Sequence, residues 1–234
     1  MSSSKVDHSP YFTSILFDWD DTLVDSLSAR VTALDNVFKQ HELTDIQAEE
    51  FLHDLKGTLL EAALLKLQNE RGIKDSLFNC YRINYWTKPT GGIWLYPSVI
   101  ELLDTLKSRG FNLGIVTQKG RDFEFQGCRV GVMKELEELG ITGLFSVIVG
   151  FEDVPEPKPD PSGMILALST LRVQPQETLF VGDSLADIKA ARAAGCWCCH
   201  ATWGITGNQT WQDIIRADFT AVSPDDIVDL VCPG

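Results

Sequence analysis

A short apolar run of β-prone residues opens the patterned part of the chain. It covers residues 13–17 and ends abruptly in an acidic segment, residues 18–22, which contains Asp18 and Asp20. An uninterrupted apolar run of this length is typical of a strand that is buried on both faces of a sheet. We therefore predict a buried strand whose carboxyl end carries an acidic site.

Residues 26–86 carry a different pattern, in which apolar side chains recur at helical spacing. Val31, Leu34 and Phe38 illustrate this spacing, and charged residues fill the positions between them. Such a pattern is typical of amphipathic helices, and we predict a module of about four of them. Residues 88–92 contain a proline and two glycines, so we expect a linker there.

Helical and strand patterns alternate from Tyr96 to the end of the chain. We predict helices over residues 98–109, 133–139, 161–171, 185–194, 211–216 and 225–231. We predict strands over residues 112–116, 144–149, 178–181, 196–201 and 218–222. Repeated strand–helix units are typical of an α/β fold, with a parallel sheet and helices on both of its faces.

Polar side chains follow several of these predicted strands. Asp18 and Asp20 follow the first strand, Thr117 follows the strand at residues 112–116, and Asp183 follows the strand at residues 178–181. Ligands of open parallel sheets bind beyond the carboxyl ends of the strands. We therefore expect these side chains to converge on one edge, with the helical module covering that edge as a lid.

The charge of the chain limits its partners. Lys and Arg number 20 against 33 Asp and Glu, which gives a formal charge of −13. Nucleic acids and anionic membranes would repel such a protein, so we expect neither as a partner. No apolar run reaches the ~20 residues that span a bilayer. Residues 1–10 are polar and unlike a signal peptide, so we expect a disordered tail and a cytoplasmic location.

The cysteines allow two interpretations. Three of the six cysteines lie within residues 196–200, beside His200. A metal site is the first interpretation, and a buried strand with cysteine as a small hydrophobe is the second. A zinc site usually needs a second ligand pair, and the other three cysteines are scattered singly. This favours the strand, and the cytosol would keep the thiols reduced.

The converging carboxylates predict metal and phosphoryl chemistry. Clustered carboxylates repel one another unless a cation lies among them, and hard oxygen ligands favour Mg²⁺. Asp18, Asp183 and the backbone carbonyl of Asp20 form a plausible ligand set. Asp187 lies one helical turn after Asp183, where it could hold a metal-bound water. Each of these residues alone has a plainer interpretation, such as a helix N-cap or an exposed charge.

A carboxylate beside a metal can attack phosphorus and form an aspartyl-phosphate. Asp20, two residues after Asp18, could protonate the leaving oxygen and then activate water. Lys158, between two prolines, could neutralise the phosphoryl group. Thr117 could offer it a hydroxyl and a backbone amide.

The segments that contain these candidate residues resemble the motifs of a known family. Residues 18–23 resemble the first motif, Asp-x-Asp-x-Thr, of the haloacid dehalogenase superfamily of phosphohydrolases. Thr117 looks like the second motif, Lys158 the third and residues 182–187 the fourth, and residues 190–195 also resemble that family. The resemblance covers about residues 11–231. It implies a Rossmann-like core with an inserted helical cap, as in relatives of phosphoglycolate phosphatase and β-phosphoglucomutase.

The resemblance also implies boundaries and roles. The core would comprise residues 11–24 and 93–234, and the cap residues 25–92. Asp18 would be the nucleophile and Asp20 the general acid/base. Thr117 and Lys158 would bind the phosphoryl group, and Mg²⁺ would be held by Asp18, Asp20, Asp183 and Asp187.

Some positions depart from the family pattern or stay open. Asp21 replaces a common glycine, and we expect it to face solvent. Gln118 stands where relatives often carry asparagine, and we count it among the substrate-binding residues. Residues 119–129 are expected to form a surface loop. Lys56 of the cap could meet an anionic substrate, although a solvated helix-end charge is the plainer alternative.

The expected activity is hydrolysis of a small phosphorylated metabolite by a monomer or homodimer. Asp20 argues against dehalogenation, because dehalogenases lack that second aspartate. The missing lysine just after Gly57 lowers the case for a phosphonatase, although Lys56 keeps that alternative open. A phosphomutase shares every core residue and remains an alternative, as does a non-catalytic binding protein on the same fold.

Overall fold

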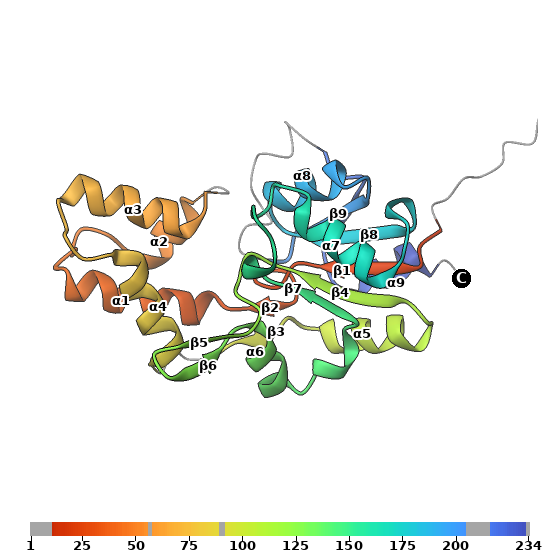
Figure 1. The fold of residues 1–234 in the computed structure, drawn as a ribbon, viewed down its shortest axis with the longest axis horizontal. Coiled ribbons are helices and arrows are strands. Elements are labelled where there is room, and N and C mark those ends of the chain that lie inside the picture. The colour runs from red at the N-terminus through yellow and green to blue at the C-terminus, as the bar shows by residue number, and fades with distance from the viewer. Residues whose placement is uncertain (1–10, 56–57, 89–91, 205–215, 233–234) are drawn as a thin grey trace, which may run out of the picture.

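The computed structural model describes residues 11–55, 58–88, 92–204 and 216–232. Within them, the main sheet has the strand order β10-β9-β8-β1-β4-β7, and its pairs are parallel (Figure 1). The strands are β1 (Ser14–Phe17), β4 (Asn112–Val116), β7 (Val147–Val149), β8 (Thr178–Gly182), β9 (Trp197–Ala201) and β10 (Phe219–Ala221). The predicted α/β class with a parallel sheet is confirmed.

Helices cover both faces of this sheet. The helices are α5 (Val99–Ser108), α6 (Val132–Leu139), α7 (Ser162–Leu171), α8 (Leu185–Ala193) and α9 (Asp225–Val231). Successive strand residues point to opposite faces. Ile15 and Phe17 therefore pack with α5, α6 and α9, whereas Leu16 packs with α7 and α8. The alternation explains why Ile15, Leu16 and Phe17 are all apolar and buried.

In the described part of the chain, four helices between β2 and β3 form a second lobe, beside the sheet in Figure 1. They are α1 (Leu27–Gln40), α2 (Ala48–His53), α3 (Leu60–Arg71) and α4 (Leu77–Thr87). Their apolar faces build a separate core that includes Leu34, Leu64 and Leu77. The chain enters this lobe through β2 (Val24–Asp25) and leaves it through β3 (Trp94–Leu95), and the two strands pair antiparallel. We call these helices the cap.

The expectation of a surface loop over residues 119–129 is wrong. Strands β5 (Phe123–Phe125) and β6 (Cys128–Val130) form an antiparallel hairpin there. Gln126 and Gly127 link them, with φ values of 50° and 77°. Two-residue hairpin turns favour positive φ at both central positions, and glycine adopts it without strain. The signal was therefore present, as a glycine following the alternating residues 123–125.

Other elements follow the expected pattern with shifted ends. The predicted strand at residues 144–149 is shortened to β7, because a 3₁₀ helix covers Thr142–Leu144. The strand interpretation of the cysteine cluster is confirmed by β9, in which Cys198 and Cys199 are buried. The tail at residues 1–10, most of the linker, most of the predicted helix at residues 211–216, and Lys56 lie outside the described residues.

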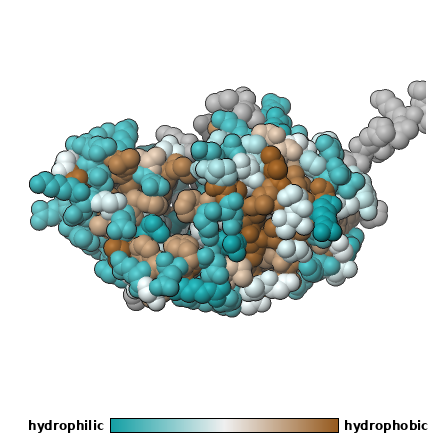
Figure 2. Space-filling model, viewed as in Figure 1, coloured by the Kyte–Doolittle hydropathy of each residue, from teal (hydrophilic) through white to brown (hydrophobic). Residues whose placement is uncertain are grey.

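In Figure 2, apolar side chains gather on the core half of the face shown, and the outer edges of both lobes are mainly hydrophilic. None of the helices in the described part of the chain is long and apolar enough to cross a membrane.

Candidate active site

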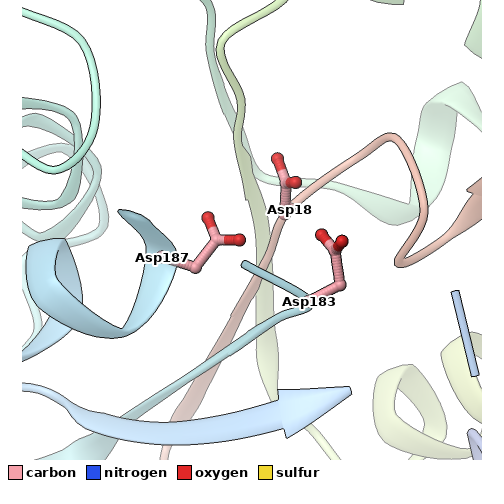
Figure 3. A group of neighbouring side chains, drawn as sticks. All are labelled: Asp18, Asp183 and Asp187. Atoms are coloured by element: carbon pink, nitrogen blue, oxygen red, sulfur yellow. The ribbon is translucent and has the colours of Figure 1, made fainter. Parts of the chain in front are cut away.

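Three aspartates meet at the carboxyl edge of the sheet. Asp18 follows β1 and Asp183 follows β8, and these neighbouring strands pair Phe17 with Val181. Asp187 lies in the first turn of α8 and is turned toward the other two, as Figure 3 shows. One carboxylate oxygen of each residue lies within 4.8 Å of the others. Asp18 and Asp183 therefore lie close together at this edge, as the sequence predicts.

Lys158 joins two of these carboxylates. Its Nζ donates to Asp18 Oδ1 at 2.8 Å, to Asp187 Oδ1 at 2.6 Å and to the Val116 carbonyl at 3.0 Å. Its side chain is 5% exposed, so the charge is shielded from water. Burial alone would lower the pKa of Lys158, but the two carboxylates outweigh it and raise that pKa. Lys158 therefore stays charged beside Asp18.

Asp187 is fixed on both of its oxygens. Oδ1 accepts from Lys158, while Oδ2 accepts from the Ser184 hydroxyl at 2.6 Å and from the Ser184 amide at 3.0 Å. Ser184 in turn caps α8 by accepting from the Asp187 amide. A Cβ added to Gly182 would lie 2.6 Å from Asp187 Cγ, so the glycine makes room for this carboxylate.

The pKa values of Asp18 and Asp183 are raised. Burial raises the pKa of Asp18 to about 7, against the opposing effect of Lys158. Burial, followed by repulsion from Asp21, Asp187 and Asp18, raises the pKa of Asp183 well above its usual range. A hard divalent cation would neutralise such crowded carboxylate oxygens, whose charge is not fully compensated by the protein. The donor set therefore fits Mg²⁺, with Asp18 and Asp183 better placed as ligands than Asp187.

The second-motif residues are held by the backbone. The Thr117 amide donates to the Val149 carbonyl at 3.0 Å, so the expectation that it would serve a phosphate oxygen is wrong. The Thr117 hydroxyl accepts from the Lys119 amide at 3.1 Å and keeps its own proton to donate. Gln118, expected to bind substrate, donates its side-chain amide to the Lys158 carbonyl at 2.6 Å. Gln118 therefore supports the loop that carries Lys158.

Asp20 is held by two donors on one oxygen. Its Oδ1 accepts from the Ser26 hydroxyl at 2.6 Å and from Lys119 Nζ at 3.3 Å. Burial would raise the pKa of Asp20, but Lys119 and Arg30 outweigh it and lower that pKa. The sequence interpretation missed Lys119, which was assigned to a surface loop. Its position two residues after Thr117, at a strand end, was the available signal.

The expectation that Asp21 faces solvent is wrong. Asp21 is 3% exposed, and Arg30 Nη2 donates to its two carboxylate oxygens at 2.5 and 2.7 Å. Its φ is 62°, and a Cβ on Gly204 would lie 1.9 Å from its carbonyl oxygen. The sequence alone does not predict the burial of Asp21, because its partner Arg30 comes from α1, on the cap side.

A cavity of about 520 Å³ lies between the cap and the core. Leu59 lines it from the cap, and residues 156–161 line it from the core. Lys158 is among the lining residues, and its Nζ contacts Asp18.

Comparisons with known proteins agree with this geometry. Residues 15–201 match the family model described as haloacid dehalogenase-like hydrolase. A phosphoglycolate phosphatase from Aquifex aeolicus is 30% identical over 217 residues, covering 93% of this chain and 95% of the relative. The pyrophosphatase PpaX from Bacillus velezensis is 33% identical, covering 85% and 87%. A solved haloacid dehalogenase-like hydrolase from Bacteroides fragilis has a TM-score of 0.77 at 30% identity, covering 92% and 99%.

Proposed function

The chain belongs to the haloacid dehalogenase-like hydrolases, as a phosphoric monoester hydrolase, and we propose that it uses Asp18 to cleave a small phosphorylated metabolite. The observation that carries this proposal is the contact of Lys158 Nζ with Asp18 Oδ1 at 2.8 Å, beside Asp183 and two residues before Asp20. This arrangement offers a nucleophile, a phosphate-binding cation and an acid/base in one place.

The first half of the reaction forms an aspartyl-phosphate. A carboxylate oxygen of Asp18 attacks phosphorus, and the bond from phosphorus to the ester oxygen breaks. Asp20 gives its proton to that leaving oxygen. Lys119 and Arg30 favour the ionised form of Asp20, but the anionic phosphoryl group that binds beside it would raise its pKa. Lys158 and the Thr117 hydroxyl stabilise the charge on the phosphoryl oxygens.

The second half releases phosphate. Asp20, now ionised, accepts a proton from water, and the resulting hydroxide oxygen bonds to phosphorus as the bond to Asp18 breaks. The low pKa that Lys119 gives to Asp20 prepares it for this step. Bound Mg²⁺, with Asp18, Asp183 and the backbone carbonyl of Asp20 as its proposed ligands, would supply charge neutralisation to the phosphoryl group. Asp187 supports that site through Lys158.

The substrate is proposed from the relatives. Phosphoglycolate and pyrophosphate are the first compounds to test, because the relatives are named for those substrates. Lys56 remains our candidate for contact with an anionic substrate. Gln118 was expected to bind substrate, and we now propose that it supports the loop that carries Lys158.

The test begins with phosphate release. Purified protein with Mg²⁺ is given p-nitrophenyl phosphate and a panel of phosphorylated metabolites, and Asp18→Asn is the inactive control. Borohydride treatment of acid-quenched enzyme converts an aspartyl-phosphate to homoserine, which mass spectrometry should find at position 18. No turnover across the panel would contradict the proposal and favour a binding protein. An isomeric phosphate ester in place of free phosphate would indicate a phosphomutase.

A further inference from the structure

Asp20 belongs to a buried cluster between the two lobes that also includes Lys119, Glu135 and Tyr85. Lys119 Nζ lies 2.6 Å from Glu135 Oε1, 2.7 Å from the Tyr85 hydroxyl and 3.3 Å from Asp20 Oδ1. Trp19, between the two motif aspartates, donates its Nε1 to Glu135 Oε2 at 2.7 Å. The Lys119 and Glu135 side chains are 10% and 8% exposed. Four segments of the chain thus meet at one ammonium group.

The backbone fixes Lys119 opposite Glu135. Glu135 lies in the first turn of α6, whose first amides donate to the loop that follows Lys119. Val132 N donates to the Gly120 carbonyl at 3.0 Å and Met133 N to the Arg121 carbonyl at 2.9 Å. This satisfies amides that the start of a helix leaves unpaired. The loop and the helix therefore form one unit, on which Lys119 and Glu135 face each other.

The cap side of the cluster is held by aromatic contacts. Tyr85 packs edge-on against Trp86, with ring centroids 4.7 Å apart, and Trp86 packs edge-on against Phe123 of β5 at 6.0 Å. Arg82 lies over the Phe125 ring at 4.6 Å. Edge-on ring contacts and a cation over an aromatic face are both favourable. The β5–β6 hairpin thus holds α4 where the Tyr85 hydroxyl reaches Lys119.

The two donors to Asp20 act on the same atom. Lys119 and Ser26 both contact Oδ1, and Ser26 directly precedes α1, at the entrance to the cap. Two donors from different elements restrict rotation of the carboxylate. Proton transfer to a leaving group would then use Oδ2 in a defined direction.

We propose that Lys119 is a positioning residue that orients Asp20 for proton transfer, and that Tyr85 makes this orientation depend on the docked cap. The inference rests on the proposed function, since it assigns Asp20 as the acid/base. Lys119 acts through Asp20, with Glu135 and Tyr85 holding the ammonium in place. When α4 moves away, Lys119 loses one of its oxygen partners, and Asp20 is oriented less well.

The experiment compares esters whose leaving groups differ in their need for a proton. An alkyl phosphate needs protonation of its leaving oxygen, whereas p-nitrophenolate leaves without it. The kcat/KM of Lys119→Met is expected to fall on the order of 100-fold for an alkyl phosphate that the wild type hydrolyses. For p-nitrophenyl phosphate we expect a loss below about threefold, because general-acid help matters little there.

Two further variants test the same role if Lys119→Met does not fold. Lys119→Met with Glu135→Gln avoids leaving Glu135 buried without a cationic partner, and it should show the same selective loss. Tyr85→Phe keeps the ring and removes only the hydroxyl. We expect it to lower kcat/KM for the alkyl phosphate on the order of five- to tenfold, the size of one hydrogen bond. Lys66→Met is the matched control, since Lys66 is 76% exposed on α3 of the cap and pairs with Glu70.

The outcomes separate the two proposals. Equal losses for both esters, or no loss for the alkyl phosphate in Lys119→Met and Tyr85→Phe, would overturn the positioning role while wild-type turnover still supports the phosphatase. A wild-type protein that hydrolyses neither these esters nor any compound of the metabolite panel would overturn the proposed function itself. If both Lys119 variants fail to fold, Tyr85→Phe is the test. A selective loss for the alkyl phosphate supports the positioning role, and equal losses for the two esters overturn it.

Discussion

Lys158 and Asp187 form a buried ion pair, with Nζ and Oδ1 2.6 Å apart. Lys158 Nζ also donates to Asp18 Oδ1, and the Ser184 hydroxyl donates to the other carboxylate oxygen of Asp187. The pair therefore fixes the direction of the lysine that the proposed phosphoryl group would meet. Asp187 and Asp183 are both carboxylates at the same edge, yet their bonding gives them different expected roles.

We predict that Asp183→Asn and Asp187→Asn damage different properties. Asp183→Asn should weaken Mg²⁺ activation on the order of 10-fold or more, because it removes a proposed ligand. Asp187→Asn should lower kcat by a similar factor with a smaller change in the Mg²⁺ requirement, because it disturbs Lys158. Titration of activity with Mg²⁺ measures both effects. An equal rise in the Mg²⁺ requirement for the two variants would contradict this division.

We predict that stabilisation by Mg²⁺ grows with pH. The pKa of Asp18 is about 7 in the folded, metal-free protein, against an ordinary value of 3.8. The folded state then binds more protons than the unfolded state, so the contribution of Asp18 to stability is lost as pH rises from about 4 to about 7. A cation that binds the ionised carboxylates offsets this loss. The rise in Tm on adding Mg²⁺ should be larger at pH 8 than at pH 5, and a constant rise would contradict the linkage.

Gly182→Ala should damage the site through Asp187. The added Cβ would lie 2.6 Å from Asp187 Cγ, so the carboxylate must shift. We expect a loss of about 1–3 kcal/mol in the free energy of unfolding, typical of overpacking, together with a fall in kcat. Gly143→Ala is the control, because nothing lies within 4 Å of its added Cβ. Urea denaturation and turnover measure both properties. Equal behaviour of the two variants would show that the contact is unimportant.

Arg30→Met should destabilise the fold. It leaves Asp21 buried without the guanidinium that contacts both of its oxygens. Breaking a buried ion pair by removing one partner costs about 3–5 kcal/mol. Arg71→Met removes the partner of Asp45 in an exposed, solvent-screened pair, so its loss should destabilise the fold far less. Chemical denaturation distinguishes them, and similar costs for both variants would argue against a structural role of Asp21.

The sequence predicted those site residues whose placement depends on strands. The apolar runs before Asp18, Thr117 and Asp183 identify buried parallel strands, and parallel strands bring their carboxyl ends to one edge. The side chains that follow such runs can therefore be placed without knowing any long-range contact.

The residues that were misplaced depend on partners far away in the chain. Asp21 is buried because Arg30 of α1 folds back over it, and Lys119 is buried because Glu135 and Tyr85 surround it. A charged side chain alone predicts exposure, and only the folded contacts reverse that prediction. The direction of the Gln118 amide likewise depends on Lys158, 40 positions further along the chain.

The paired strands β2 and β3 bring the two ends of the cap together, with Val24 opposite Leu95. A segment whose ends lie side by side can be lengthened, shortened or replaced without moving the sheet that carries the aspartates. Changes in the cap could therefore alter which molecules reach Asp18. The chemistry of the core would be kept only where the cap side still supplies Ser26, Arg30 and Tyr85, which contact Asp20, Asp21 and Lys119.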